Sequence, residues 1–172
     1  SGSYVVVFLD RSDNHYPVAQ VRHILIKAVA DSDGSYTDKA KEIAKNRAEE
    51  ILAEFNAGDK TEDSFAELAK DYSEDTGSAE NGGLYDTVYK GATVEEFDKF
   101  CFEGHKKGDT AIVYGESSSY AGYHVMYYVG EGDLYSNLLA KNDLVNTTVS
   151  QWVEDQVSAL TVTNGWWLRI AG

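Results

Sequence analysis

The distribution of apolar and polar residues predicts a chain in which strands and helices alternate. Residues 4–9 are β-branched and aromatic, as is typical of a buried strand. Residues 21–27 place apolar side chains on both faces of an alternating pattern, which favours a central strand. Residues 40–55 repeat apolar side chains at helical spacing, with Thr37 as the expected N-cap and Gly58 as the expected stop. The N-terminal third therefore predicts two strands followed by a long helix.

The rest of the chain continues this alternation. Further elements are expected as a helix at 63–71, a short extended run after Leu84, a helix at 94–102, strands at 110–114 and 122–129, and a helix at 134–160. Asn142 and Asn146 are expected to interrupt the last helix. Residues 161–170 predict a terminal strand around an Asn164-Gly165 turn. This strand either packs on residues 4–9, which we favour, or docks on another domain.

A polar, glycine-rich segment at residues 72–84 stands out because it has no periodicity. A loop of this length inside a compact domain is typically functional or mobile. Two histidines, His23 and His124, lie on predicted strands that are far from it in the sequence, and the fold can bring them beside it. We therefore interpret the loop as one wall of a binding pocket.

Composition and charge narrow the function classes. The chain has 172 residues and a formal net charge of −14, which argues against nucleic acid or an anionic membrane as the main partner. Solubility alone is an equally good explanation of the acidity. One cysteine, Cys101, excludes an intramolecular disulfide, and no metal-binding spacing of cysteine or histidine is present. No apolar run approaches the roughly 20 residues needed to cross a bilayer. Because the sequence opens at Ser1 without methionine, we expect it to be part of a longer protein.

Several short motifs occur in an order and spacing that together identify a family resemblance. They are Arg22-His23-Ile24-Leu25-Ile26, Phe55-Asn56-Ala57-Gly58, Ser64-Phe65-Ala66-Glu67-Leu68-Ala69-Lys70-Asp71-Tyr72-Ser73-Glu74-Asp75, Gly77-Ser78-Ala79, Asn81-Gly82-Gly83-Leu84, Glu95-Glu96-Phe97 with Phe102, and Gly122-Tyr123-His124-Val125. With these motifs, residues 19–132 resemble a parvulin-type peptidyl-prolyl isomerase domain.

The resemblance implies an α+β fold, a parvulin-like (FKBP-like) four-stranded antiparallel sheet wrapped by helices. Three segments are then expected: an N-terminal strand and linker at 1–18, the isomerase domain at 19–132, and a C-terminal helix and strand at 133–172 that packs with the N-terminal segment. The implied function is cis/trans isomerisation of X-Pro bonds in unfolded or exported chains. The chemistry needs no nucleophile, metal or cofactor, because only rotation about the amide is catalysed.

The resemblance also assigns roles to individual residues. The expected catalytic residues are His23, Asp75, His124 and Ser119, the last in place of a threonine hydroxyl that hydrogen-bonds the histidine pair. The expected substrate-binding residues are Leu84, Thr93, Val94, Phe97, Phe102 and Tyr123. Structural explanations stay open: a histidine pair that satisfies its own hydrogen bonds, a turn-forming Asp75, and Leu84 and Phe97 as ordinary core.

Two departures from the family pattern motivate an alternative function. Thr93 stands where the family usually has a pocket methionine, and Glu96 stands where a proline often precedes the pocket phenylalanine. A smaller and more polar wall weakens proline binding, so the alternative is a parvulin-shaped chaperone or binding module with little turnover. The segment 27–37 lacks an arginine cluster, which argues against selectivity for phosphoserine before proline.

The partners and location follow from the same resemblance. The expected partner is a proline-containing unfolded or nascent polypeptide, with no nucleic acid, no membrane span in this chain and dimerisation through the terminal segments as an option. The expected location is extracytoplasmic, secreted or anchored through a preceding region, as in exported bacterial foldases.

Overall fold

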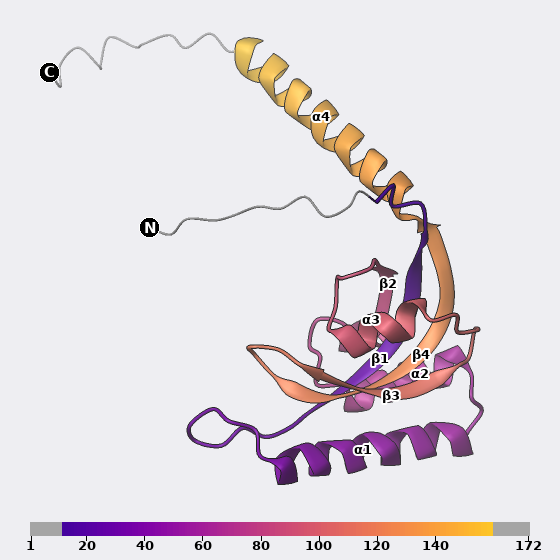
Figure 1. The fold of residues 1–172 in the computed structure, drawn as a ribbon. Coiled ribbons are helices and arrows are strands. Elements are labelled where there is room, and N and C mark those ends of the chain that lie inside the picture. The colour runs from indigo at the N-terminus through magenta and orange to yellow at the C-terminus, as the bar shows by residue number, and fades with distance from the viewer. Residues whose placement is uncertain (1–11, 160–172) are drawn as a thin grey trace, which may run out of the picture. The chain divides into compact units, whose positions relative to one another are not determined.

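A four-stranded antiparallel sheet forms the centre of the fold in a computed structural model that describes residues 12–159 (Figure 1). Its strand order is β2-β1-β4-β3, so the two long strands β1 and β4 are central. The strands are β1 (Pro17–Lys27), β2 (Leu84–Val88), β3 (Thr110–Glu116) and β4 (Ala121–Leu134). This arrangement confirms the predicted α+β, parvulin-like fold class.

Helices connect and follow the strands. They are α1 (Asp38–Ala57), α2 (Glu62–Tyr72), the short 3-10 helix η1 (Ala79–Asn81), α3 (Glu95–Phe102) and α4 (Tyr135–Ala159). The predicted caps of α1 are confirmed: the Thr37 side chain accepts a hydrogen bond from the Ala40 N–H, and Gly58 follows the last turn. The helix α2 opens with a capping box between Thr61 and Ser64.

The alternation of β1 divides the core into two layers, one on each face of the sheet. Ile24 and Ile26 pack with α1 and α2 on one face, while Val21 packs with α3 on the other. His23 points to the same face as Val21, because side chains two apart on a strand share a face. Figure 1 shows α1 and α3 on opposite sides of the sheet. The histidine is therefore presented toward α3.

The polar loop predicted at 72–84 lies on the edge of β1, beyond the end of β2. The Leu25 N–H donates to the Ser73 hydroxyl, and the Glu74 N–H donates to the Leu25 carbonyl oxygen. Further along, the His23 N–H donates to the Gly83 carbonyl oxygen. These bonds replace the pairing that a longer β2 would supply, and they hold the loop next to His23.

The C-terminal helix differs from the expectation in one respect. The predicted interruption at Asn142 and Asn146 is wrong, since α4 is continuous from Tyr135 to Ala159. Residues 15–135 form one compact unit and α4 belongs to another, so each is described by itself. The expected strands at 4–9 and 161–170 lie outside the described residues, and the three-segment division remains a prediction. None of the helices within residues 12–159 is both long and apolar enough to span a membrane.

Candidate active site

Two buried histidines form the floor of the site on the α3 face of the sheet. His23 on β1 and His124 on β4 lie diagonally across the strand pair, because Leu25 pairs with His124 and His23 pairs with Met126. Their Nδ1 atoms are 3.0 Å apart, and the residues are only 1% and 4% exposed. Two rings so close and so buried share a hydrogen bond, which needs a proton on one Nδ1 and a lone pair on the other.

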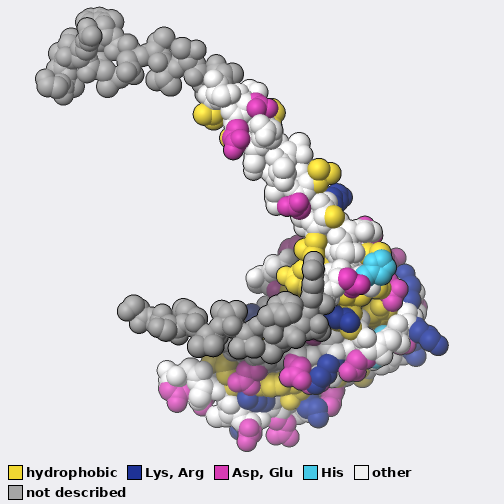
Figure 2. Space-filling model, turned by 45° about the horizontal axis from the view of Figure 1, so that its top comes forward, with side chains coloured by type: hydrophobic (Ala, Val, Ile, Leu, Met, Phe, Trp, Pro, Cys, Tyr) yellow, Lys and Arg dark blue, Asp and Glu magenta, His cyan; other side chains and the backbone are white. Residues whose placement is uncertain are grey.

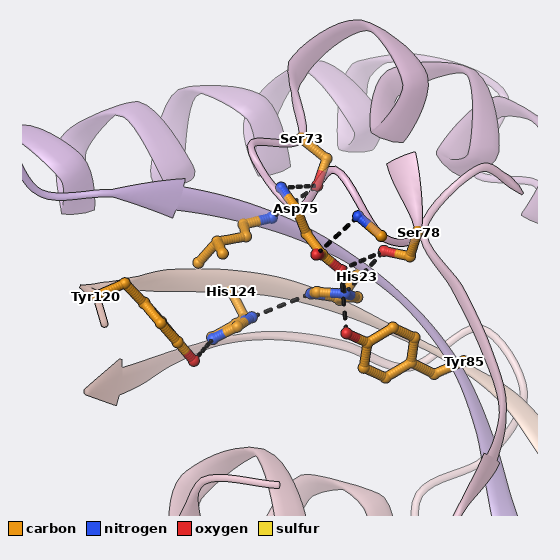
Figure 3. Close-up of polar contacts among 9 residues, drawn as sticks. His23, Ser73, Asp75, Ser78, Tyr85, Tyr120 and His124 are labelled. Atoms are coloured by element: carbon orange, nitrogen blue, oxygen red, sulfur yellow. Dashed lines mark hydrogen bonds and ion pairs between the residues drawn. The ribbon is translucent and has the colours of Figure 1, made fainter. Parts of the chain in front are cut away.

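Asp75 lies at the other side of His23 and accepts several hydrogen bonds (Figure 3). Its Oδ2 atom is 3.0 Å from His23 Nε2, and it accepts from the hydroxyls of Ser78 at 2.6 Å and Tyr85 at 3.0 Å. Its Oδ1 atom accepts from the Gly77 N–H at 3.2 Å. The hydrogen bond from His23 holds the pKa of Asp75 well below its usual value, with Ser78 acting in the same direction against the effect of burial. Asp75 is therefore a carboxylate at neutral pH.

A charged Asp75 fixes the donor at its own end of the hydrogen-bond chain. A carboxylate can only accept, so His23 donates from Nε2; in the neutral imidazole the other nitrogen, Nδ1, then carries a lone pair. His124 must then donate from Nδ1 to His23, which leaves a lone pair on its Nε2. That lone pair faces the Tyr120 hydroxyl at 3.0 Å, and Tyr120 donates to it. With both imidazoles neutral, protons are donated in one direction, from Tyr120 through His124 and His23 to Asp75; Figure 3 shows the contacts of this chain.

The environment keeps His124 neutral. Burial, and after it the nearby His23, lowers the pKa of His124 to about 3 against the opposing effect of the Asp75 charge. Burial, and then the charge of Asp75, raises the pKa of Tyr85 to about 12, so this phenol remains a donor. The site therefore holds a negative charge on Asp75, with a neutral His124 and a protonated Tyr85 phenol close to it.

A hollow of about 320 Å³ lies over the histidine pair. Its lining residues are His23, Tyr85, Ala92, Thr93, Val94, Phe97, Tyr120 and His124. The Phe97 ring stands edge-on to both imidazoles, with ring centres 5.4 Å from His23 and 5.3 Å from His124. A hollow with an aromatic wall and a polar floor is suited to a small apolar ring attached to a polar group.

Gly115 on β3 makes room for the contact between Tyr120 and His124. A Cβ atom at this position would lie 2.7 Å from His124 Nε2 and 3.0 Å from the Tyr120 hydroxyl oxygen. Contacts that short require the ring or the phenol to move. The absence of a side chain at residue 115 is therefore part of the geometry of the site.

Comparison with known proteins agrees with this geometry. The family model of the PPIC-type PPIase domain matches residues 6–129, well over half of the chain. The chain belongs to the PPIC-type peptidyl-prolyl isomerase family.

Within the described residues no cluster of three or more histidine, cysteine or acidic side chains is arranged to hold a metal ion.

Curated relatives of this PPIC-type domain are foldases. The chain is 30% identical to foldase protein PrsA 3 of Bacillus anthracis over 158 residues, which is 92% of this chain and 45% of that protein. It is 36% identical to foldase protein PrsA of Staphylococcus aureus over 139 residues, which is 81% of this chain and 40% of that protein. The chain thus spans less than half the length of these relatives.

A solved structure also shares the fold. The crystal structure of peptidylprolyl isomerase PrsA from Bacillus anthracis matches with a TM-score of 0.50 and 25% sequence identity. The match covers 88% of this chain and 64% of that one.

The structure brings most of the predicted site residues of the PPIC-type domain together. His23, Asp75 and His124 form one hydrogen-bonded group. Thr93, Val94 and Phe97 line the hollow above it. Their roles in catalysis and binding remain proposals.

The expected contact of Ser119 with the histidine pair is wrong. Its exposed hydroxyl lies 3.1 Å from that of Ser117 in the β3–β4 turn, and the hydroxyl next to His124 belongs to Tyr120. The long phenol reaches inward from a position where a short serine side chain cannot.

The other three predicted binding residues line different surfaces. Tyr123 is on the opposite face of the sheet from His124, where it packs with the α1 and α2 layer. Phe102 lines a separate pocket that includes Tyr16 and Cys101. Leu84 lines a groove beside the hollow rather than the hollow itself.

Sequence reasoning missed four residues of the site: Ser78, Tyr85, Ala92 and Tyr120. A usable signal existed for two of them. Ser78 follows Asp75 by three residues in the loop already identified as a pocket wall, and Tyr120 is adjacent to the hydroxyl that was selected.

Proposed function

We propose that this chain is a peptidyl-prolyl cis/trans isomerase that acts on X-Pro bonds of unfolded or exported polypeptides and so assists their folding. The observation that carries the proposal is the Tyr120–His124–His23–Asp75 hydrogen-bond chain under a hollow walled by Phe97. Membership of the PPIC-type family and the likeness to named foldases support it.

The hollow supplies the binding part of the mechanism. Rotation about an X-Pro amide faces a barrier of about 18–20 kcal/mol, which arises from the double-bond character of the C–N bond. A proline ring seated against Phe97 and Val94 takes the adjoining amide out of water. The planar amide is the more charge-separated form, so losing water destabilises it relative to the twisted form. Catalysis requires only that the twisted amide be bound better than the planar one.

The hydrogen-bond chain supplies the electrostatic part. The planar amide concentrates negative charge on its carbonyl oxygen, and twisting returns part of that charge to nitrogen. A fixed carboxylate at Asp75, held in place by three side chains and one backbone N–H, disfavours a carbonyl oxygen that is strongly negative. Because burial keeps His124 neutral, this ring places no cation beside Asp75.

A protease-coupled assay with proline tetrapeptides tests the proposal. The protein as it exists is expected to accelerate cis-to-trans exchange, which takes tens to hundreds of seconds without a catalyst. Asp75→Ala should lose most of the acceleration while remaining folded by circular dichroism. Folded protein that leaves the exchange rate at background would refute the isomerase proposal.

The exposed apolar side chains of α4 favour a second candidate, a chaperone or binding module with little turnover. Seven large apolar residues of α4, including Leu144 and Trp152, are between 40% and 67% exposed. Figure 2 shows hydrophobic side chains along the surface of this helix. Surfaces of this kind bind apolar segments of unfolded chains. Suppressed aggregation of an unfolding client that is unaffected by Asp75→Ala would support this candidate, whereas loss of suppression in that variant would favour the isomerase site.

We also propose an extracytoplasmic location and a dimer formed through residues 1–18 and 133–172. The support for the location is the resemblance to exported foldases. Cell fractionation of the full-length protein tests it, and sedimentation of the chain over a concentration series tests the dimer. Recovery in the cytoplasm or a concentration-independent monomer would overturn the respective proposal.

A further inference from the structure

A second hollow adjoins the one over the histidines. It has a volume of about 420 Å³ and extends beside the edge strand β2. Tyr85, Ala92 and Thr93 line both hollows, so the two share a wall. The remaining lining residues are Gly77, Ser78, Asn81, Leu84, Asp86, Thr87 and Val88. We call this second hollow the β2 groove.

The position of the β2 groove makes it continuous with the path of a bound polypeptide. A chain whose proline ring occupies the hollow over His23 continues on both sides of that ring. A neighbouring residue is about 3.8 Å away along the backbone, and its side chain can reach a hollow that shares a wall with the first. The β2 groove therefore faces the side chain of a residue next to proline.

The charge in the β2 groove has one sign. The carboxylate of Asp86 is exposed and accepts a hydrogen bond from the Thr87 hydroxyl at 3.1 Å. Among the described residues, none that line either hollow is a lysine or arginine. Lys99 of α3 pairs with Glu95 and Glu96, and Arg22, which donates to the carbonyl oxygen of the lining residue Asn81, pairs with Glu62. Asp86 is thus an acidic group without a cationic partner in the described part of the chain.

The uncharged wall fits the stem of a long basic side chain. Leu84 and Ala92 offer apolar surface, while Asp86 lines the same groove with an exposed side chain. Lysine and arginine bury their methylene stems along apolar surface and keep the charged end near water. An acidic side chain in the same place would face Asp86 without compensation.

We propose that the β2 groove is a subsite for the residue adjoining proline and that Asp86 selects lysine or arginine there. This inference rests on the proposed isomerase site, because the proline must occupy the neighbouring hollow. It specifies the substrate as prolyl bonds flanked by a basic residue.

The experiment compares tetrapeptides that carry lysine, alanine or glutamate either directly before or directly after proline. At one of the two positions, kcat/KM for lysine should exceed that for glutamate by roughly two- to fivefold at low salt, as for an exposed ion pair. The ratio should shrink as ionic strength rises, because salt screens exposed charges.

Two variants separate the local effect of Asp86 from the general attraction of an acidic protein. Asp86→Asn should lower the ratio of kcat/KM for the lysine peptide to that for the glutamate peptide. What remains should be only the preference that the net negative charge of the protein produces. Asp59→Asn removes the same charge from the pocket between α1 and α2, remote from the β2 groove, and should leave the ratio as in the parent. Equal effects of both variants, or no discrimination at either position, would overturn the proposal.

Failure of the isomerase function is distinguishable from failure of this inference. If no tetrapeptide is turned over, affinities for the same peptides are measured by calorimetry. A lysine-to-glutamate affinity ratio that depends on Asp86 but not on Asp59 supports the subsite. A ratio that Asp86→Asn leaves unchanged contradicts it.

Discussion

The Nδ1 atoms of His23 and His124 lie 3.0 Å apart, so one proton serves both imidazoles at this contact. Which ring carries it is decided outside the pair, by Asp75 at one end and Tyr120 at the other. The histidine pair therefore lies between a carboxylate, which can only accept hydrogen bonds, and a phenol hydroxyl, which can donate one. Changing either end should disturb both rings.

Removing the charge of Asp75 should impair both stability and activity. In Asp75→Asn the side-chain oxygen still accepts from His23, but the charge-assisted bonds from Ser78 and Tyr85 become ordinary ones. We expect the free energy of unfolding to fall by about 1–3 kcal/mol and kcat/KM to fall by at least about tenfold. Chemical denaturation and the protease-coupled assay measure the two effects. Asp71→Asn, at the exposed end of α2, is the control and should leave both near the parent values.

Tyr120 and Ser119 offer a matched test of which hydroxyl serves the histidine pair. Tyr120→Phe removes the donor to His124 Nε2 and leaves a buried acceptor unpaired, which destabilises the fold by about 1–3 kcal/mol. We expect kcat/KM to fall several-fold with it. Ser119→Ala removes an exposed hydroxyl and should change stability by less than about 0.5 kcal/mol. A larger loss of stability and kcat/KM in Ser119→Ala than in Tyr120→Phe would mean that Ser119, not Tyr120, hydrogen-bonds the histidine pair.

Stability should decrease as the pH falls below about 6.5. Folding lowers the pKa of His124 to about 3, so between these values the unfolded chain binds a proton that the folded chain does not. Each such proton makes the free energy of unfolding fall by up to about 1.4 kcal/mol per pH unit. Folding also lowers the pKa of Asp75, which adds a loss in the same direction below about pH 4.

Urea denaturation at successive pH values measures this slope. A His124→Gln variant lacks the titrating ring and should show a shallower dependence between pH 6.5 and pH 4. A parent protein whose stability is flat across that interval would contradict the proposed neutral state of His124.

The buried hydroxyl of Thr93 should make the parent protein less stable than the isosteric variant Thr93→Val. Its Oγ1 atom is buried and has no hydrogen-bond partner in the described part of the chain. Thr93→Val keeps the shape and removes the polar atom, so we expect the free energy of unfolding to rise by about 1 kcal/mol. Thr87→Val, whose exposed hydroxyl donates to Asp86, should give no such gain. A destabilised Thr93→Val variant would mean that the hydroxyl is paired in solution.

Two glycines with similar backbone angles should respond very differently to alanine. Gly83 has a φ of +68°, and a Cβ there would lie 2.1 Å from the carbonyl oxygen of His23. Gly34 has a φ of +84° with nothing within 4 Å. We expect Gly34→Ala to destabilise by about 1–2 kcal/mol, from backbone strain alone. Gly83→Ala should destabilise clearly more, and it should also reduce activity because the clash displaces His23. Thermal unfolding compares the two.

Most of the fold was predictable because it depends on local patterns. The Thr37 cap, the Gly58 stop and the period-two alternation of β1 each act over a few residues, and the structure confirms them. The break predicted in α4 was wrong because two asparagine-containing groups lower helix propensity only slightly. A helix of 25 residues tolerates that loss.

The site was predictable in part for a different reason. His23, Asp75 and His124 follow from family motifs, and the structure brings them together. Tyr120 was missed because side-chain reach decides which hydroxyl meets His124, and reach depends on where the β3–β4 turn ends. Tyr85 was missed because β2 pairs irregularly with β1, which changes the face that its side chain takes. Neither effect is contained in the spacing of residue types.

Gly115 limits which residues can occupy position 120. A Cβ at this position would overlap the space in which Tyr120 and His124 meet, so the identities of residues 115 and 120 are not independent. Among related sequences, a bulky phenol at the second position should occur only with glycine at the first. Wherever an alanine or larger residue replaces that glycine, a shorter hydroxyl group should be found approaching the imidazole from another direction. The pair can thus serve as a covariation marker for the orientation of the hydrogen-bond chain in genomes where no structure exists.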